Sequence, residues 1–171
     1  MTRAYARAAR GQRATGEVPR GRRERLTVIG ALGPGGLVAS RSVAAATGTA
    51  VFLTFVEQAL VPALRDRPEA VVVMDNLAAH KAEAVRAALE AAEVSYREPW
   101  PRAGAAGPGA ALLLARPEPD RAGLGQAQTH LRAVGARSKE ALGAALGPAL
   151  ATITARDARG WFRLAGYPAA D

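Results

Sequence analysis

One short apolar run, Val71 to Met74, constrains the fold of this chain most strongly. Three of its four residues are valines and no polar residue alternates with them, so the run predicts a short strand buried on both faces. It ends at Asp75 and Asn76, with His80 close behind. Because the carboxyl ends of strands carry the chemistry of α/β proteins, Asp75 is a candidate magnesium ligand. The pattern leaves open that Asp75 and Asn76 only turn the chain and cap the next helix.

The composition fits one domain and excludes several kinds of site. The 171 residues are 49% hydrophobic, which suffices for a core although much of it is alanine. The absence of cysteine excludes disulfides and thiol nucleophiles, and His80 and His130 are too far apart for a zinc cluster. No run reaches the length of a membrane span and the start lacks the apolar core of a signal peptide. We therefore expect a soluble, cytoplasmic protein without a membrane partner.

Positive charge is concentrated near the start of the chain. The net charge is +8, and residues 1–25 hold eight arginines against two glutamates. Arginine favours bidentate phosphate contacts, which makes this segment a candidate for DNA binding. The residues we single out are Arg20, Arg22, Arg23 and Arg25. A solvated tail from a GC-rich genome would have the same composition, since Ala, Gly, Pro and Arg are abundant throughout.

The pattern of the chain predicts a mixed α/β order. The expected elements are a β-hairpin over 24–32 and 37–44 with a four-residue turn, a helix over 50–65, the buried strand, a helix over 81–92, and a short strand beginning at Val94. Pro62 should kink or tighten the last turn of its helix. No dinucleotide fingerprint, P-loop, nucleophile elbow or HExxH helix is present. Leu77, two positions beyond Asp75, excludes a phosphatase with an aspartyl nucleophile.

The second half of the chain is harder to interpret. Residues 98–128 are rich in proline and glycine and have no usable period, so we expect no regular element there. Ser138 should cap a helix that Gly147 and Pro148 interrupt. A capping box from Thr154 to Asp157 should open a last helix, whose Trp161 and Phe162 we interpret as core anchors rather than base-stacking groups.

Four stretches of the sequence closely resemble bacterial insertion-sequence transposases of the mariner superfamily. They cover residues 22–32, 51–62, 71–81 and 155–167, and the third contains a Met-Asp-Asn-x-x-x-His motif. The resemblance implies an RNase H-like fold and a triad of two Asp and a Glu, or three Asp, that holds two Mg²⁺ ions. Asp75 matches the second triad position. The implied activity is cleavage and strand transfer at DNA phosphodiesters, with DNA as partner, a possible homodimer and no small-molecule substrate.

The chain departs from that family at the other two triad positions. The first family Asp lies on a strand upstream of the arginine-rich segment, and this chain begins at Met1 inside that segment. The third carboxylate belongs to an Asn-Pro-Ile-Glu stretch that cannot be read here. A one-base shift with free choice of synonymous codons, however, recovers that stretch from residues 115–128. We interpret this as a frame disruption from near residue 97 to near Thr129; an ordinary family-specific loop is the alternative.

These features predict an arginine-rich segment over 1–23 and a partial RNase H-like domain over 24–171, with an irregular insert at about 97–128. We expect a core over 24–96 with helices 138–165 packed against it, and marginal stability. The sheet should lack its first, central strand, and residues 98–128 should not fill the gap because glycine and proline disfavour strand pairing. The leading functional hypothesis is a catalytically impaired transposase fragment in which Glu118 and Asp120 do not replace the lost acids. The alternatives are a non-catalytic basic DNA-binding protein without sequence specificity and an inert fragment.

Overall fold

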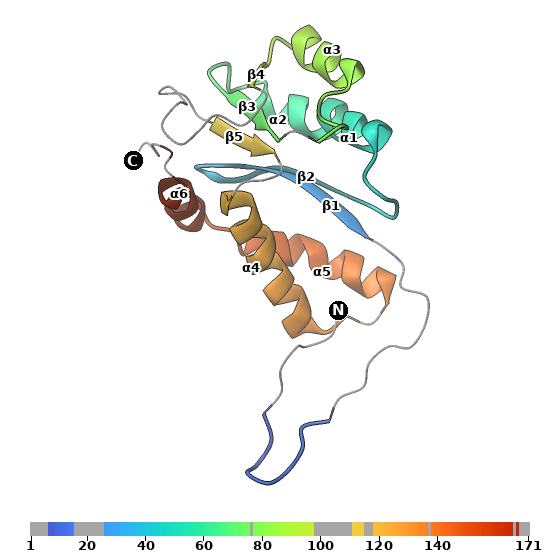
Figure 1. Cartoon of the computed structure of the whole chain (residues 1–171), viewed down its shortest axis with the longest axis vertical. Helices are drawn as coiled ribbons and strands as arrows, with labels where there is room; N and C mark the ends of the chain where they lie inside the picture. The colour runs from blue at the N-terminus through green and yellow to red at the C-terminus, as the bar shows by residue number, and fades with distance from the viewer. Residues whose placement is uncertain are drawn as a thin grey trace.

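The structure, a computed structural model, describes residues 7–15, 26–75, 77–97, 111–114, 118–136, 138–165 and 167. For residues 111–114 and 118–121 the description is of the backbone. A five-stranded mixed sheet lies between two layers of helices, with α1 to α3 on one face and α4 to α6 on the other (Figure 1). This is the RNase H-like α/β architecture expected from the sequence. Within the described ranges, none of the helices has the length and apolar character that crossing a bilayer needs.

The sheet has the strand order β2-β1-β5-β3-β4. The strands are β1 (Thr27–Gly33), β2 (Gly36–Val43), β3 (Val71–Met74), β4 (Ser95–Arg97) and β5 (Ala111–Leu114). β1 pairs antiparallel with both β2 and β5, whereas β3 pairs parallel with both β5 and β4. β5 therefore joins an antiparallel hairpin to a parallel pair, and the predicted buried strand β3 has a neighbour on each side.

The predicted hairpin is confirmed, with a tighter turn than expected. Gly33 pairs with Gly36, so Pro34 and Gly35 alone form the loop. Gly36 has φ of 112°, a conformation that residues with a Cβ rarely adopt. A glycine at this position therefore allows the chain to turn back into β2, and the register of the two strands shifts once, between Ala31 and Leu32.

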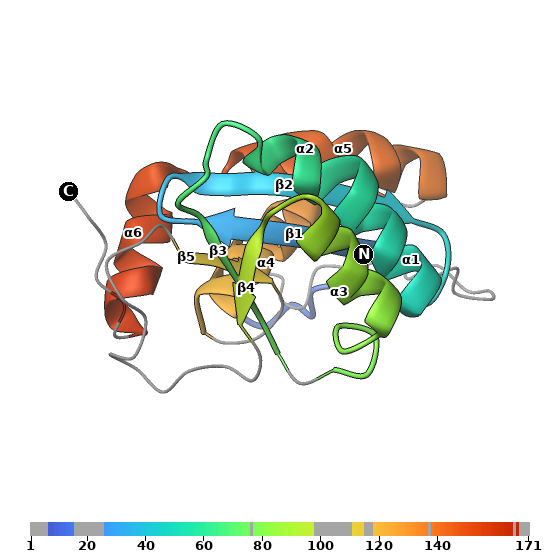
Figure 2. The same ribbon diagram turned by 90° about the horizontal axis from the view of Figure 1, so that it is seen from above.

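The first helical layer covers the face of the sheet shown uppermost in Figure 1. It consists of α1 (Thr49–Phe55), the π-helical segment η1 (Val56–Leu60), α2 (Val61–Leu64) and α3 (Glu83–Ala91). Seen from above, α1 and α2 lie along the hairpin and α3 lies beside β4 (Figure 2). The first three segments are one continuous helical stretch, as predicted, and the disturbance expected at Pro62 is a widened turn immediately before it rather than a tightened one.

The second helical layer consists of α4 (Glu118–Val134), α5 (Lys139–Ala151) and α6 (Ala155–Leu164). The predicted caps are confirmed, because the Ser138 hydroxyl accepts the Ala141 N–H and Thr154 forms a reciprocal capping box with Asp157. Phe162 is buried and Trp161 packs beside it, as core anchors do. The predicted interruption at Pro148 is wrong. α5 continues through it because neighbouring leucines keep the helix packed on α4.

The expectation that residues 98–128 hold no regular element is wrong for two segments. β5 occupies the gap that was expected to stay open between β1 and β3, and α4 begins at Glu118. Residues 111–114 are Ala-Leu-Leu-Leu, without glycine or proline, so the breakers surround this strand rather than interrupt it. Pro119 lies in the first turn of α4, where the absence of its N–H has no consequence for the helix.

Candidate functional site

Asp75 lies at the carboxyl end of β3, and its side chain is 15% exposed. Its Oδ1 atom accepts a hydrogen bond from the Leu77 backbone N–H at 3.1 Å, which turns the chain out of the sheet. The suggestion that Asp75 turns the chain is therefore confirmed. The suggestion that it caps the next helix is wrong, since the N-cap of α3 is Ala82 and makes no side-chain capping bond.

His80 stands directly against this carboxylate. Its side chain is buried, with 2% of its surface exposed. Among the described residues, it is the one polar or charged residue that is buried. Its Nδ1 atom lies 2.7 Å from Oδ1 of Asp75, within ion-pairing distance. The oxygen is not in line with the ring N–H, so Nδ1 has no aligned hydrogen bond among the described residues. The carboxylate and the imidazole thus form a close pair that bridges the end of β3 and the following turn.

Local structure and packing both hold the His80 ring. The His80 backbone N–H donates to the Leu77 carbonyl at 3.0 Å, which curls the chain back toward the sheet. On the side of the helical layer, the Phe52 ring of α1 lies with its centroid 4.2 Å from that of His80, tilted by 41°. The sequence placed His80 in a motif with Asp75 without assigning it a role. The signal that could have done so is the short, turn-forming spacing between the two residues.

The described residues do not fit a two-ion metal site. Oδ1 of Asp75 is engaged by Leu77 and His80, and Oδ2 has no partner among the described residues. No group of three side chains able to hold a metal ion occurs in the parts of the chain that the structure describes. A single carboxylate oxygen is too few ligands for a pair of Mg²⁺ ions, which need carboxylates and phosphates converging on them.

The neighbouring strand brings no second carboxylate of its own. Leu114 of β5 is the register partner of Met74, and each is the last residue of its strand. Asp75 follows Met74 in the sequence, whereas Ala115 follows Leu114. Glu118 opens α4 three positions further on, but its side chain and that of Asp120 lie outside the description.

The other residues proposed from the sequence cannot be compared with the structure. Arg20, Arg22, Arg23 and Arg25 lie outside the described residues, as does Asn76. Of the same arginine-rich segment, residues 7–15 are described, and all of them are exposed. The structure therefore brings Asp75 and His80 together and leaves the arginines as sequence-based candidates.

Shifted pKa values occur in the second helical layer and just after it. Burial raises the pKa of Tyr167 to about 12, and this ring packs against Phe162 beneath the sheet. Hydrogen bonds from the Thr154 hydroxyl, the Thr154 backbone N–H and Gln126 lower the pKa of Asp157. At the start of α5, a backbone hydrogen bond and one from Ser138 lower the pKa of Glu140. These shifts follow from packing and capping.

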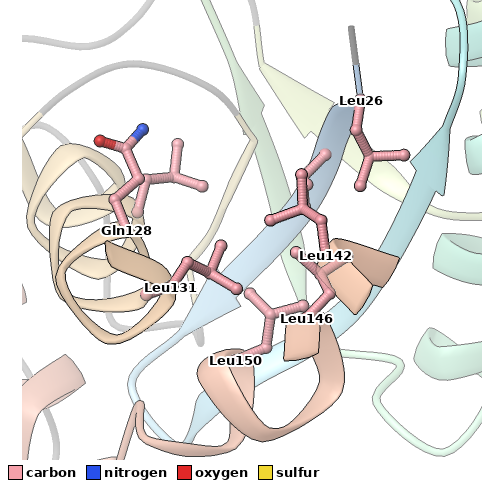
Figure 3. A pocket seen from close by; sticks show the side chains of 9 residues that line it. Leu26, Gln128, Leu131, Leu142, Leu146 and Leu150 are labelled. Carbon is pink, nitrogen blue, oxygen red and sulfur yellow. The ribbon is translucent and has the colours of Figure 1, made fainter. Parts of the chain in front are cut away.

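A groove of about 190 Å³ opens in the second helical layer. Leucines of α4 and α5 face one another across it, with Leu26 at the entry to β1 (Figure 3). Among the described residues that line it, Gln128 is the polar one and none is titratable. An enzyme pocket needs a few convergent polar groups among its apolar walls, and this groove does not have them. The chemistry of the described residues is therefore at the end of β3.

Comparison with known proteins matches part of the chain to a family. Residues 1–103 match the family described as DDE superfamily endonuclease, which is more than half of the chain and includes β1 to β4, Asp75 and His80. No curated protein matches the chain. Nucleases of this superfamily act on DNA and generally use divalent metal ions. Together with the mixed sheet and the aspartate at the end of its buried strand, the match shows that the chain belongs to the DDE superfamily endonucleases.

Proposed function

We propose that this chain is a fragment of the catalytic domain of an insertion-sequence transposase of the mariner superfamily, impaired in its chemistry on DNA phosphodiesters. The observation that carries the proposal is the set of contacts that the Asp75 carboxylate makes at the end of β3. Its carboxylate is held by Leu77 and His80 and has one oxygen without a described partner, as a metal ligand requires. No second carboxylate joins it among the described residues, and we expect the two-ion reaction to fail for that reason.

The extent of the family match supports the proposed frame disruption. The match ends at residue 103, soon after residue 97, where we infer that the reading frame changed. Resequencing the locus and translating its shifted frames tests this inference. The expected result is an unchanged sequence in which a frame shifted by one base reads Asn-Pro-Ile-Glu over the codons of residues 115–128. No such reading in either shifted frame would reject the disruption and favour a family-specific loop, and a one-base correction near residue 97 that restores the reading would overturn the proposed impairment.

The proposed impairment is tested with a nicking and strand-transfer assay. The substrate is DNA carrying the terminal repeats of the element, supplied with Mg²⁺ or Mn²⁺. We expect no product above that of the Asp75→Ala variant. Asp66→Ala is the matched control, since it removes an exposed carboxylate from a loop. Turnover that is lost in Asp75→Ala but kept in Asp66→Ala would overturn the impairment and would identify Asp75 as a catalytic residue.

The second candidate function is DNA binding without sequence preference. It is favoured by the +6 charge of residues 1–25 and by the exposure of Arg7, Arg10 and Arg13 in the described part of that segment. Binding of this kind weakens steeply with salt, with a slope of about −0.9 in log affinity per phosphate contact.

A salt titration on random-sequence duplex DNA tests this candidate. Changing Arg20, Arg22, Arg23 and Arg25 together to glutamine should flatten the slope. Changing the exposed Arg65 and Arg67 to glutamine removes two charges rather than four from another surface, and it should alter the slope by less than half as much. An unchanged slope in the fourfold variant would mean that these arginines are a solvated surface, and no binding at all would favour an inert fragment.

A further inference from the structure

We propose that His80 is a positioning residue that fixes the orientation of the Asp75 carboxylate. This inference rests on the proposed role of Asp75 and assigns a role to a residue that does not itself touch the substrate. In this arrangement His80 and the Leu77 N–H both engage Oδ1, and Oδ2 is left as the oxygen available to a ligand.

The first argument is that both contacts converge on one oxygen atom. The Leu77 N–H donates to Oδ1 at 3.1 Å, and Nδ1 of His80 lies 2.7 Å from the same atom. Two nitrogen groups on one oxygen define the side-chain torsions of an aspartate, because any other rotamer would lose both. Ligating carboxylates are commonly oriented by such neighbours.

The second argument is that burial of an imidazole at this position needs a reason. His80 is almost fully buried and its ring packs on Phe52 in an apolar layer. Phenylalanine or leucine would fill the same volume without the cost of removing ring nitrogens from water. The side-chain nitrogen that faces Asp75 is also the one buried polar atom without an aligned hydrogen bond in the described part of the chain. Oδ1 of Asp75 lies 2.7 Å from it.

The third argument is that the ring itself is fixed in place. Its backbone is held by the hydrogen bond to Leu77, and its face lies against a phenylalanine that is itself buried in α1. A ring that is held in this way restricts the orientation of the group beside it, whereas a freely rotating, exposed histidine would not. The packing of His80 against Phe52 of the first helical layer therefore fixes the orientation of the Asp75 carboxylate.

The test compares two replacements of His80. His80→Phe keeps a ring against Phe52 and removes the nitrogen that faces Asp75. His80→Asn loses the ring and places an amide N–H near the position of Nδ1. The readout is the set of three-bond couplings that report χ1 of Asp75, measured by NMR on isotope-labelled full-length protein. We expect one rotamer in the parent, averaged couplings in His80→Phe and one rotamer again in His80→Asn. A single unchanged rotamer in His80→Phe would overturn the proposal.

A double-mutant cycle with Asp75→Asn gives an independent measurement. Residues coupled by direct contact should show a non-additive effect, and we expect about a fivefold coupling in the unfolding equilibrium constant. Additive effects would contradict the proposal. If His80→Phe does not fold, Asp75→Ala replaces it, and the ring ¹⁵N resonances of His80 should shift; unchanged resonances would equally contradict the proposal. Neither measurement uses DNA or metal. A coupled pair in a protein that shows Asp75-dependent turnover on DNA would therefore reject the proposed impairment alone.

Discussion

The two helical layers cover the same sheet in different ways. Against β3, the first layer forms one continuous cluster of buried residues that includes Phe52, Phe55, Met74 and Leu89. The second layer is divided into two smaller clusters, one around Phe162 and the other made of alanines and leucines of α4 and α5. The leucine groove lies in the second layer. Since alanine buries little apolar area, we infer that most of the stabilising burial is in the first layer.

The difference coincides with the extent of the family match. The matched residues, 1–103, contain the whole first layer together with Asp75 and His80, whereas β5 and the second layer lie beyond them. The candidate site is thus supported by the better packed half of the molecule. The part of the molecule beyond the match contacts the strand that carries the site, because β5 pairs directly with β3.

The largest effect should come from breaking β5, because this strand alone joins the hairpin to the parallel pair. Leu113 pairs with Leu32 of β1 and with Val73 of β3. Leu113→Pro removes a backbone donor from a central strand, where proline is not tolerated. We expect the cooperative urea transition to disappear and amide protection to fall in both β1 and β3. Leu113→Val is the control and should unfold cooperatively. Normal cooperativity in Leu113→Pro would mean that the two layers fold independently of β5.

The next largest effect should distinguish the two layers by truncation of a core side chain in each. Phe55→Ala empties a fully buried position of the first layer and should cost about 3–5 kcal/mol. Leu146→Ala truncates a wall of the groove, which is already open, and should cost about 2 kcal/mol. Urea denaturation of both variants measures the difference. An equal or larger cost for Leu146→Ala would contradict our inference that the first layer is the more stabilising one.

A smaller effect is expected at the start of α6. Thr154→Ala removes both the cap and the strongest cause of the lowered pKa of Asp157, and should cost about 1 kcal/mol at neutral pH. Because the folded-state pKa of Asp157 is below its ordinary value of 3.8, its stabilising contribution is present above that pH and is lost as the pH falls through the folded-state value. Thermal unfolding from pH 7 down to about pH 2 should therefore show the difference between the parent and the variant becoming smaller. The part that comes from the bond between the Asp157 N–H and the Thr154 hydroxyl should remain. Thr129→Ala, which removes a hydroxyl bonded within α4, should be nearly neutral and independent of pH.

The smallest effect should come from filling the groove. Gln128→Leu adds apolar surface to its rim and should gain about 0.5 kcal/mol, seen as a small rise in melting temperature. Gln128→Ala is the matched control, since it improves helix propensity without filling space. If alanine stabilises as much as leucine, the groove does not limit the stability of the second layer.

The sequence predicted the first half of the fold well because its local signals agree with one another. The valine run, the hairpin glycines and the helical period from Val51 to Leu64 each indicate a single structure, and all three are present. At the site, the sequence identified Asp75, but the contact with His80 depends on a turn and on Phe52 of another helix. Packing between elements that are distant in the chain leaves no periodic signal.

The sequence failed where composition obscured a short strand. Residues 111–114 form an apolar run much like that of β3, and the same reasoning would have found it. Leucine is a weaker strand former than valine, and the surrounding glycines and prolines favoured a loop. Pro119 is one of the prolines that indicated a loop, whereas it lies in the first turn of a helix. Tertiary context favours the strand, because the backbone groups of β1 and β3 that face each other need a strand between them to pair with.

The central position of β5 also has a consequence for the order in which the chain is made. β1 and β3 are synthesised well before the strand that separates them, so during translation each presents an unpaired edge to the cell. The sheet cannot close until residues 111–114 have left the ribosome and entered between strands that are already formed. Pairing of such distant segments is slow, and exposed edges favour association with other chains in the interval. The yield of folded protein should therefore depend on how fast the late strand arrives, which makes synthesis rate and chaperone supply determinants of whether this molecule accumulates.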